Sequence, residues 1–199
     1  MYSTAAQALL LLSASTSALA WWQPAPGTTW EIVLSKTLDD VGTLPSVQAI
    51  DADLEDNDSD LWQSVKEQGY RTICYFSAGS YEDWRGDADS FPSEAIGNPL
   101  DDWEGEAWLD TRNEDVRDIM RSRIDAAAEK GCDAIDPDNL DVYEHDGGGF
   151  DLTIDDAVNY VQFLSEYAHS KDIAVGLKNG GQMVEQVLDF VDFEVNEQC

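Results

Sequence analysis

The feature that most constrains the fold is an alternation of short apolar runs with longer segments of helical periodicity. The apolar runs are rich in Val, Ile and aromatic residues, and their length is typical of strands rather than helices. They cover residues 30–34, 47–52, 71–76, 133–136, 173–177 and 190–195. A helix between successive strands is typical of βαβ units, so the order predicts a parallel sheet.

Three of the segments between these runs carry helix-capping residues. The predicted N-terminal caps are Ser59–Asp60, Asn113 and Thr153, and the predicted C-terminal glycines are Gly69 and Gly131. The alternation alone does not distinguish a barrel from an open doubly wound sheet. No glycine-rich phosphate loop follows the first strand, which argues against a nucleotide-binding version of the fold.

Charge restricts the partners of the chain. Its 199 residues suit one domain, and they include 41 Asp plus Glu against 11 Lys plus Arg, for a net charge of -30. Such a surface repels nucleic acid and anionic membranes and attracts cationic polymers. We therefore expect no nucleic acid and no membrane among its partners. Solubility alone would account for the charge equally well, since net charge does not define chemistry.

The N-terminus has the pattern of an export signal. Residues 8–13 are apolar, and Ala18-Leu19-Ala20 supplies a small-x-small cleavage pattern, although no Lys or Arg precedes the apolar run. The run is too short to span a membrane, and a buried core helix is the alternative. We expect residues 1–20 to be a signal peptide, 21–29 a linker and 30–199 the catalytic domain of a secreted, extracellular monomer.

The cysteines do not indicate a metal site. Cys74, Cys132 and Cys199 lack zinc-ligand spacing, and the two histidines, His145 and His169, lie far apart in the sequence. The sequence therefore predicts no metal and no cofactor. In an oxidising compartment, an odd number of cysteines leaves one thiol without an intramolecular partner.

Acidic residues follow several predicted strands. Asp51 and Asp53 end the second strand, Asp136 and Asp138 the fourth, and Glu197 follows the sixth. In parallel α/β folds these C-terminal ends carry the reacting groups. Glycoside hydrolysis requires two carboxylates across one opening: one protonates the leaving oxygen, and the other attacks the sugar or activates a water. The plainer interpretation of each single Asp is a helix cap.

Several segments resemble glycoside hydrolase family 114, the endo-α-1,4-polygalactosaminidase family. They are residues 73–85 (ICYFSAGSYEDWR), 131–139 (GCDAIDPDN), 176–179 (GLKN), 195–199 (VNEQC) and, more weakly, 103–110 (WEGEAWLD). The resemblance implies a (β/α)8 TIM-type barrel, distantly related to α-galactosidases, that cleaves α-1,4-linked galactosamine polymers internally. The chain reaches residue 199 directly after the sixth strand, so we expect a barrel truncated after about six strands.

The resemblance also implies roles for the carboxylates. Asp138, at the end of the fourth strand, matches the nucleophile, and Glu197, after the sixth, matches the acid/base. Asp136 rivals Asp138, because alternation places the two on one face of the strand. A carboxylate separation of about 5–5.5 Å would indicate a retaining mechanism and about 6.5–9.5 Å an inverting one, and the sequence does not give this distance.

The remaining candidates would bind the substrate. The predicted substrate-binding residues are Asp51, Asp53, Tyr75, Trp84, Asp110, Asp136, Lys178 and Asn179. Aromatic rings, including those of Tyr81 and Trp108, offer flat faces to sugars or pack in the core. Lys178 could hold a nearby carboxylate ionised, and the acidic residues would complement a cationic galactosamine polymer, the expected partner.

Two alternatives remain. One is a non-catalytic, carbohydrate-binding remnant of a barrel. The other is a calcium-binding loop, since Asp56, Asp58 and Asp60 alternate and Glu67 stands where a bidentate ligand would follow. A calcium loop is disfavoured, because Leu61 occupies the position of its glycine and the loop would overlap a capped helix.

Overall fold

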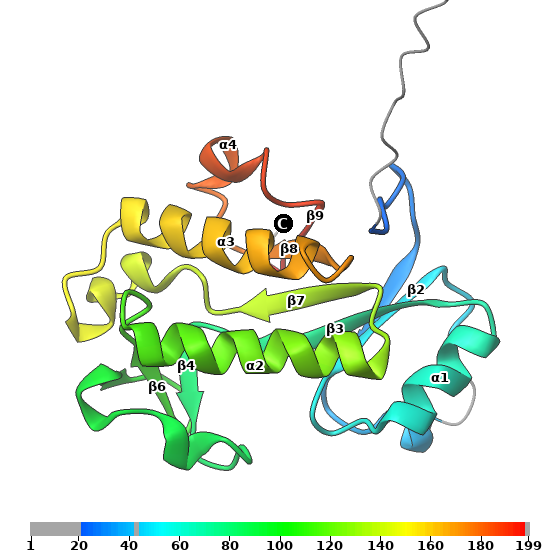
Figure 1. Ribbon diagram of the computed structural model, residues 1–199, viewed down its shortest axis with the longest axis horizontal. Helices are drawn as coiled ribbons and strands as arrows, with labels where there is room; N and C mark the ends of the chain where they lie inside the picture. Colours follow the sequence, from blue (N-terminus) through cyan, green and yellow to red (C-terminus); the bar gives the residue numbers. More distant parts are fainter. Residues whose placement is uncertain (1–20, 42–43, 198–199) are drawn as a thin grey trace, which may run out of the picture.

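The computed structural model describes residues 21–41 and 44–197. Its main sheet has six parallel strands in chain order, so that each strand lies beside the next and the sheet curls into part of a barrel (Figure 1). The strands are β1 (Trp30–Val33), β2 (Ala49–Asp53), β3 (Arg71–Ser77), β7 (Ala134–Asp138), β8 (Ala174–Lys178) and β9 (Phe193–Val195). The predicted fold, a TIM-type barrel with about six of its strands, is confirmed.

Helices cover the outer face of this sheet. They are α1 (Ser59–Glu67), α2 (Glu114–Lys130), α3 (Ile154–His169) and the short α4 (Val184–Val187). The long helices α2 and α3 lie side by side along the strands (Figure 1). Trp62, Ile124 and Leu164, one from each of α1, α2 and α3, are buried against the outward-facing residues of the strands. Within the described residues, no helix combines the length and apolar character that crossing a membrane requires.

The helix ends follow from their capping residues. The Asn113 side chain accepts hydrogen bonds at the start of α2, and Gly131 ends that helix in the left-handed conformation at φ 78°. Thr153 forms a capping box with Asp156 at the start of α3. The prediction for the first helix was wrong by one residue. Asp58, rather than Ser59 or Asp60, caps α1 by accepting from the backbone of Leu61.

The position of α1 bears on the calcium alternative. Asp60 and Glu67 belong to the helix itself and Asp58 is its cap, so these residues do not form an open loop. Across residues 21–41 and 44–197, no group of three or more His, Cys, Asp or Glu side chains is arranged to hold a metal ion. The acidic stretch is therefore the first turn and surface of a helix.

The sequence did not predict a second, small antiparallel sheet. Its strands are β4 (Ser80–Glu82), β6 (Glu106–Leu109) and β5 (Ile96–Pro99), in the order β4-β6-β5. It is inserted between β3 and α2 and follows the C-terminal end of β3 almost directly. Gly79 makes this possible, because a side chain there would overlap the backbone carbonyl of Asn139. The small sheet thus stands beside the end of β7, where Asp138 lies.

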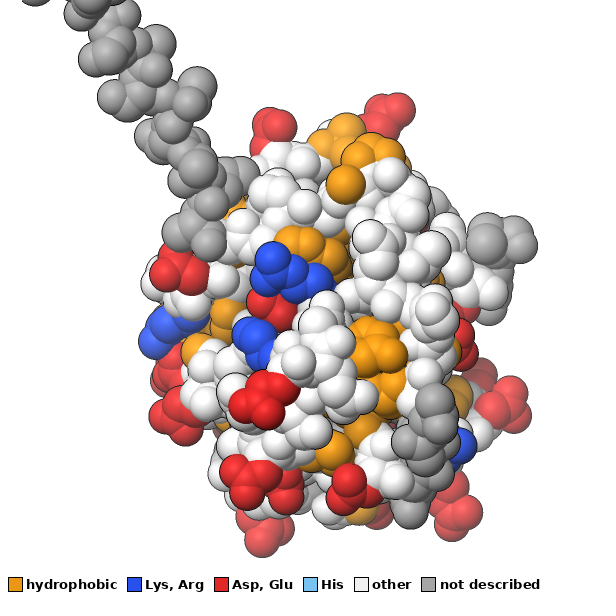
Figure 2. Space-filling view, turned by 90° about the vertical axis from the view of Figure 1, so that its right-hand side faces the viewer, with side chains coloured by type: hydrophobic (Ala, Val, Ile, Leu, Met, Phe, Trp, Pro, Cys, Tyr) orange, Lys and Arg blue, Asp and Glu red, His pale blue; other side chains and the backbone are white. Residues whose placement is uncertain are grey.

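The opposite end of the barrel is closed by aromatic residues. The first inward-facing layer of the strands is Ala49, Ile73, Ala134 and Ala174, and Trp21, Trp22 and Phe193 pack against it. Trp21 Nε1 donates to Asp192 Oδ1 at 2.9 Å, and Gln23 Nε2 donates to the same oxygen at 2.7 Å. Figure 2 faces this end and shows hydrophobic side chains near the centre, with acidic ones around the edge. Part of the expected linker is therefore packed against the barrel.

A disulfide bond joins Cys74 of β3 to Cys132, which shortly precedes β7. The two residues are 58 positions apart, and the segment between them contains the small sheet and α2. A bond that closes a loop of this length typically stabilises a fold by about 2–4 kcal/mol. Cys199, the third cysteine, lies outside the described residues.

Candidate active site

A cleft of about 790 Å³ lies at the C-terminal ends of the parallel strands. The main sheet contributes the ends of β3, β7, β8 and β9, and the small sheet contributes one wall. The lining residues used below are Tyr75, Trp103, Glu106, Trp108, Asp138, His145, Lys178, Asn179 and Glu197. Of the described residues that line the cleft, Lys178 is the only Lys or Arg.

Lys178, the last residue of β8, links the carboxylates at the bottom of the cleft. Its side chain is only 1% exposed, and its Nζ lies 3.3 Å from Asp138 Oδ2, 3.7 Å from Glu197 Oε1 and 3.8 Å from Asp136 Oδ2. Burial alone would lower the pKa of Lys178, but the charges of Asp138, Asp136 and Glu197 raise it above its ordinary value. The ammonium group therefore stays charged between the carboxylates.

Asp138 is held by three donors. Tyr75 OH donates to Oδ2 at 2.8 Å, Lys178 approaches the same oxygen, and the backbone amide of Asn139 donates to Oδ1 at 2.8 Å. Burial, and then the charge of Asp138, raise the pKa of Tyr75 well above its ordinary value, so this hydroxyl keeps its proton. These contacts fix the carboxylate at the wall of the cleft.

Glu197 lies across Lys178 from Asp138 and is held differently. Its side chain is 54% exposed, and Asn179 Nδ2 donates to its Oε2 at 3.0 Å. The Glu197 amide donates back to Asn179 Oδ1 at 3.2 Å, so the two residues fix each other. From the two distances to Lys178 Nζ, Asp138 Oδ2 and Glu197 Oε1 are at most about 7 Å apart.

Asp51 and Asp136 form a buried pair behind Lys178. Both are completely buried, and no hydrogen-bond donor of another described residue reaches their carboxyl oxygens. Burial, opposed by Lys178 and reinforced by Asp138, raises the pKa of Asp136 to about 7. Burial, and then the charge of the neighbouring Asp136, raise the pKa of Asp51 well above its ordinary value, so the Asp51 carboxyl group favours its neutral form. Asp136 lies beneath the cleft, whereas Asp138 lines it.

Known proteins share the sequence pattern of this chain. The model of Glycoside-hydrolase family GH114 matches residues 12–199. The chain belongs to this family. It is therefore a glycoside hydrolase, and the family predicted from its motifs is confirmed. A comparison with curated protein sequences found no match.

Several solved structures are similar to this GH114 chain. The crystal structure of Aspergillus fumigatus Ega3 in complex with galactosamine is 45% identical, with a TM-score of 0.86 over 89% of this chain and 70% of that one. The glycoside hydrolase domain of PelA from Pseudomonas aeruginosa is 13% identical, with a TM-score of 0.68 over 85% and 67%. An α-galactosidase from Thermus thermophilus is 17% identical, with a TM-score of 0.54 over 77% and 39%. The last two are evidence for the fold alone.

Three predicted substrate-binding residues of the GH114 chain lie away from the cleft. Asp53 is bound by Arg85, whose Nη1 and Nη2 donate at 3.0 and 2.6 Å. Asp110 is paired with Arg112 at 2.9 Å. Trp84 is 55% exposed and does not line the cleft. Trp84, Asp110 and the Arg85 that binds Asp53 all belong to the insertion after β3, and the strand pattern carries no information about that insertion.

The small sheet and the residues before it supply cleft residues, of which sequence reasoning named Trp108 but missed Glu106 and Trp103. Glu106 and Trp108 alternate along β6, so both face the cleft, and Trp103 lies just before that strand. The Trp108 ring stacks on His145 with centroids 4.6 Å apart. The resemblance of residues 103–110 to the family was the available signal, and it identified Trp108 as a possible sugar platform but not Glu106 or His145.

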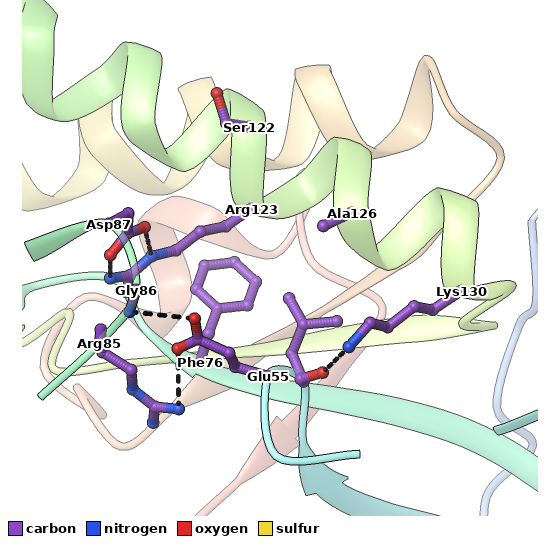
Figure 3. A pocket seen from close by; sticks show the side chains of 10 residues that line it. Glu55, Phe76, Arg85, Gly86, Asp87, Ser122, Arg123, Ala126 and Lys130 are labelled. Atoms are coloured by element: carbon purple, nitrogen blue, oxygen red, sulfur yellow. Dashed lines mark hydrogen bonds and ion pairs between the residues drawn. The ribbon is translucent and has the colours of Figure 1, made fainter. Parts of the chain in front are cut away.

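A second cavity, of about 270 Å³, lies on the outer side of the sheet between β3 and α2 (Figure 3). Its basic residues are already occupied. Arg123 is paired with Asp87 at 2.8 Å, and Lys130 donates to the carbonyl of Leu54 at 2.6 Å. The cavity thus differs from the cleft, where carboxylates outnumber their single cation.

Proposed function

We propose that this chain is an endo-acting hydrolase of α-1,4-linked galactosamine polymers, with Asp138 as nucleophile and Glu197 as acid/base. The observation that supports this most directly is that both carboxylates line one cleft and contact the same Lys178 ammonium group. The substrate class is suggested by the 45% identity to a protein whose crystal structure contains galactosamine.

In the proposed first step, Glu197 gives its proton to the glycosidic oxygen while Asp138 attacks the anomeric carbon. The bond to the leaving sugar breaks, and a glycosyl ester of Asp138 forms. Glu197, now a carboxylate, then takes a proton from the water that hydrolyses the ester. The upper limit of about 7 Å between the two side chains includes the spacing of about 5–5.5 Å that this retaining route uses.

Lys178 would keep the local charge balanced through this step. As Asp138 loses its negative charge by forming the ester, Glu197 acquires one by releasing its proton. The ammonium group lies 3.3 Å from the first side chain and 3.7 Å from the second. It therefore remains beside one negative charge in both states, and no ionic group has to move.

The charge of the protein supports a cationic substrate. Galactosamine units carry an ammonium group, and a chain of net charge -30 attracts a polymer of such units over a long range. We also propose that the protein is a monomer and is secreted. The expected signal peptide, residues 1–20, lies outside the described residues, and N-terminal sequencing of secreted protein beginning at Trp21 would test the cleavage site.

Release of reducing ends from a partly deacetylated galactosamine polymer tests the activity. We expect Asp138→Asn and Glu197→Gln to lower turnover by at least about 10²–10⁴-fold, since each removes a group that acts on the reacting bond. Asp110→Asn is the matched control, because it removes a carboxylate outside the cleft. The stereochemistry of the first sugar released, followed by NMR, tests retention. Full activity of Asp138→Asn would overturn the proposal, and polymer binding without release would identify a carbohydrate-binding remnant instead.

A further inference from the structure

Two glutamates face each other across the small sheet, and only one has a counter-ion. Glu82 of β4 is paired in register with Glu106 of β6. Arg85 donates to both oxygens of Glu82, at 2.8 and 2.9 Å. Like charges opposite one another destabilise a sheet unless each is compensated. The fold compensates Glu82 by direct contact, whereas no Lys or Arg of the described residues forms an ion pair with Glu106.

Glu106 is buried, yet part of its carboxylate remains available to a ligand. The residue is 9% exposed and lines the cleft. Its Oε2 accepts a hydrogen bond from Ser80 Oγ at 2.8 Å, whereas no donor of a described residue reaches Oε1. Burial raises the pKa of Glu106, and the charges of Glu82 and Asp138 add to this, while the Ser80 hydroxyl and the more distant Arg85 only partly oppose it. A buried carboxylate without a cation is costly, and a cationic ligand would relieve that cost.

The orientation of Glu106 is tied to that of the proposed nucleophile. Asn139 Nδ2 donates to Ser77 Oγ at 2.9 Å and to Ser80 Oγ at 3.2 Å, and Ser80 in turn donates to Glu106. The backbone amide of the same Asn139 donates to Asp138. A continuous set of hydrogen bonds therefore fixes the two carboxylates relative to each other.

Aromatic side chains line the same wall of the cleft. Trp108 follows two residues after Glu106 on β6 and is stacked on His145, and Trp103 is 64% exposed. Flat apolar faces beside a carboxylate suit a sugar ring that carries a positively charged substituent. A metal ion fits less well, because no set of three ligating side chains occurs among the described residues.

We infer that Glu106 binds the 2-ammonium group of one galactosamine unit and so makes the enzyme prefer free amines over N-acetylated units. The inference rests on the proposed function and specifies its substrate. An ammonium group brings both hydrogen-bond donors and a positive charge to Oε1. An acetamido group brings no charge and would leave the buried carboxylate uncompensated.

The test compares Glu106→Gln with the wild-type protein on two oligosaccharides of equal length, one of galactosamine and one of N-acetylgalactosamine. We expect kcat/KM for the galactosamine substrate to fall about 10- to 100-fold, the range for losing a hydrogen bond to a charged group. Activity on the N-acetylated substrate should stay unchanged or rise. Glu104→Gln is the matched control, because it removes an exposed carboxylate of the same segment that does not line the cleft.

The outcomes distinguish a role of Glu106 in substrate specificity from a general effect of the substitution on the protein. An equal loss on both substrates, or no loss on either, would overturn the role of Glu106. If the wild-type protein cleaves neither substrate, the proposed function fails, and the same variants are then compared by calorimetric titration of the two oligosaccharides. If the wild-type protein binds the galactosamine oligosaccharide more tightly and Glu106→Gln abolishes that difference, the result would still support the inference. Wild-type binding that does not distinguish the two would refute it.

Discussion

Two neighbouring regions of this protein handle their acidic residues in opposite ways. In the first, which we call the Arg85 cluster, every carboxylate is paired directly with a guanidinium group; its members are Arg85, Arg123, Asp53, Glu55, Glu82 and Asp87. In the cleft, one ammonium group faces three carboxylates and Glu106 has no cation. The Arg85 cluster is complete without a ligand, whereas the cleft is complete only when something positive enters it.

The type of cation matches this difference. Arginine offers several donors in a fixed plane, and Arg85 uses them to hold both oxygens of Asp53. Lysine provides a compact charge without that geometry. Lys178 therefore shares its charge among Asp138, Glu197 and Asp136 without fixing any of them in a bidentate way. A rigid contact within the fold and a more adaptable one in the cleft thus differ in the type of cation that makes them.

The largest effect on stability is expected from Arg85→Met. This change leaves the buried carboxylate of Asp53 without its cation and Glu82 with only Arg123 at 3.9 Å, and breaking a buried pair in this way typically costs about 3–5 kcal/mol. Urea denaturation would measure the loss in the free energy of unfolding. A loss comparable to that of an exposed pair would mean that the cluster is less important to the fold than its burial indicates.

A smaller, pH-dependent loss is expected from Lys178→Met, of about 2–3 kcal/mol near pH 8. The positive charge of Lys178 lowers the pKa of Asp136. Removing Lys178 therefore lets Asp136 take up a proton instead of remaining charged. The loss should therefore shrink as the pH falls below the Asp136 pKa of about 7, because a protonated Asp136 no longer needs the cation. Denaturation at both pH values tests this.

Lys171→Met is the matched control for Lys178→Met. Lys171 pairs with the exposed Asp125 on the surface, and such pairs contribute little to stability. We expect no measurable change in the denaturation midpoint at either pH. If the two lysine variants behaved alike, burial of the cleft cation would not matter to the fold.

The smallest effect is expected from Asp51→Asn, and its sign is opposite. A carboxyl group whose pKa is raised in the folded state binds a proton that the unfolded chain has released. Stability therefore falls as pH rises above the ordinary value of 3.8 toward the raised pKa of Asp51 in the folded protein. The amide that replaces the Asp51 carboxyl group cannot titrate, so the variant should be about 1–2 kcal/mol more stable than wild type near pH 8 and equal to it near pH 4.

Unfolding free energies at pH 4, 6 and 8 would distinguish this from a packing effect. A loss of stability at every pH would show that the Asp51 carboxyl group makes a contact that an amide cannot replace. A gain restricted to high pH would instead confirm that the pKa of Asp51 is raised in the folded protein.

The position of a site residue could be predicted from the sequence where that residue belongs to the repeating strand-helix pattern of the barrel. Asp138 and Lys178 stand at the ends of regular strands, so alternation and the strand-end rule placed them in one opening. Asp51 and Asp53 obey the same rules, yet one is buried behind Lys178 and the other is bound by Arg85. The position of Asp53 could not be predicted because its partner, Arg85, belongs to the insertion after β3.

The insertion itself was the main gap. Its strands are short, and their pairing brings Glu106 opposite Glu82 through contacts between residues more than twenty positions apart. Strand propensity does not specify such a register. The wrong cap of α1 has a simpler cause: Asp58, Ser59 and Asp60 are all good caps, and only the backbone conformation selects Asp58.

The packing of Trp21 and Trp22 has a practical consequence for handling the protein. These residues sit under the amino ends of the strands, at the far side of the barrel from the cleft, and Asp192 anchors them there. A tether attached just ahead of Trp21 would therefore hold the protein by its base and leave its opening facing outward. Immobilised in that orientation, the enzyme would offer long polymer chains unobstructed entry.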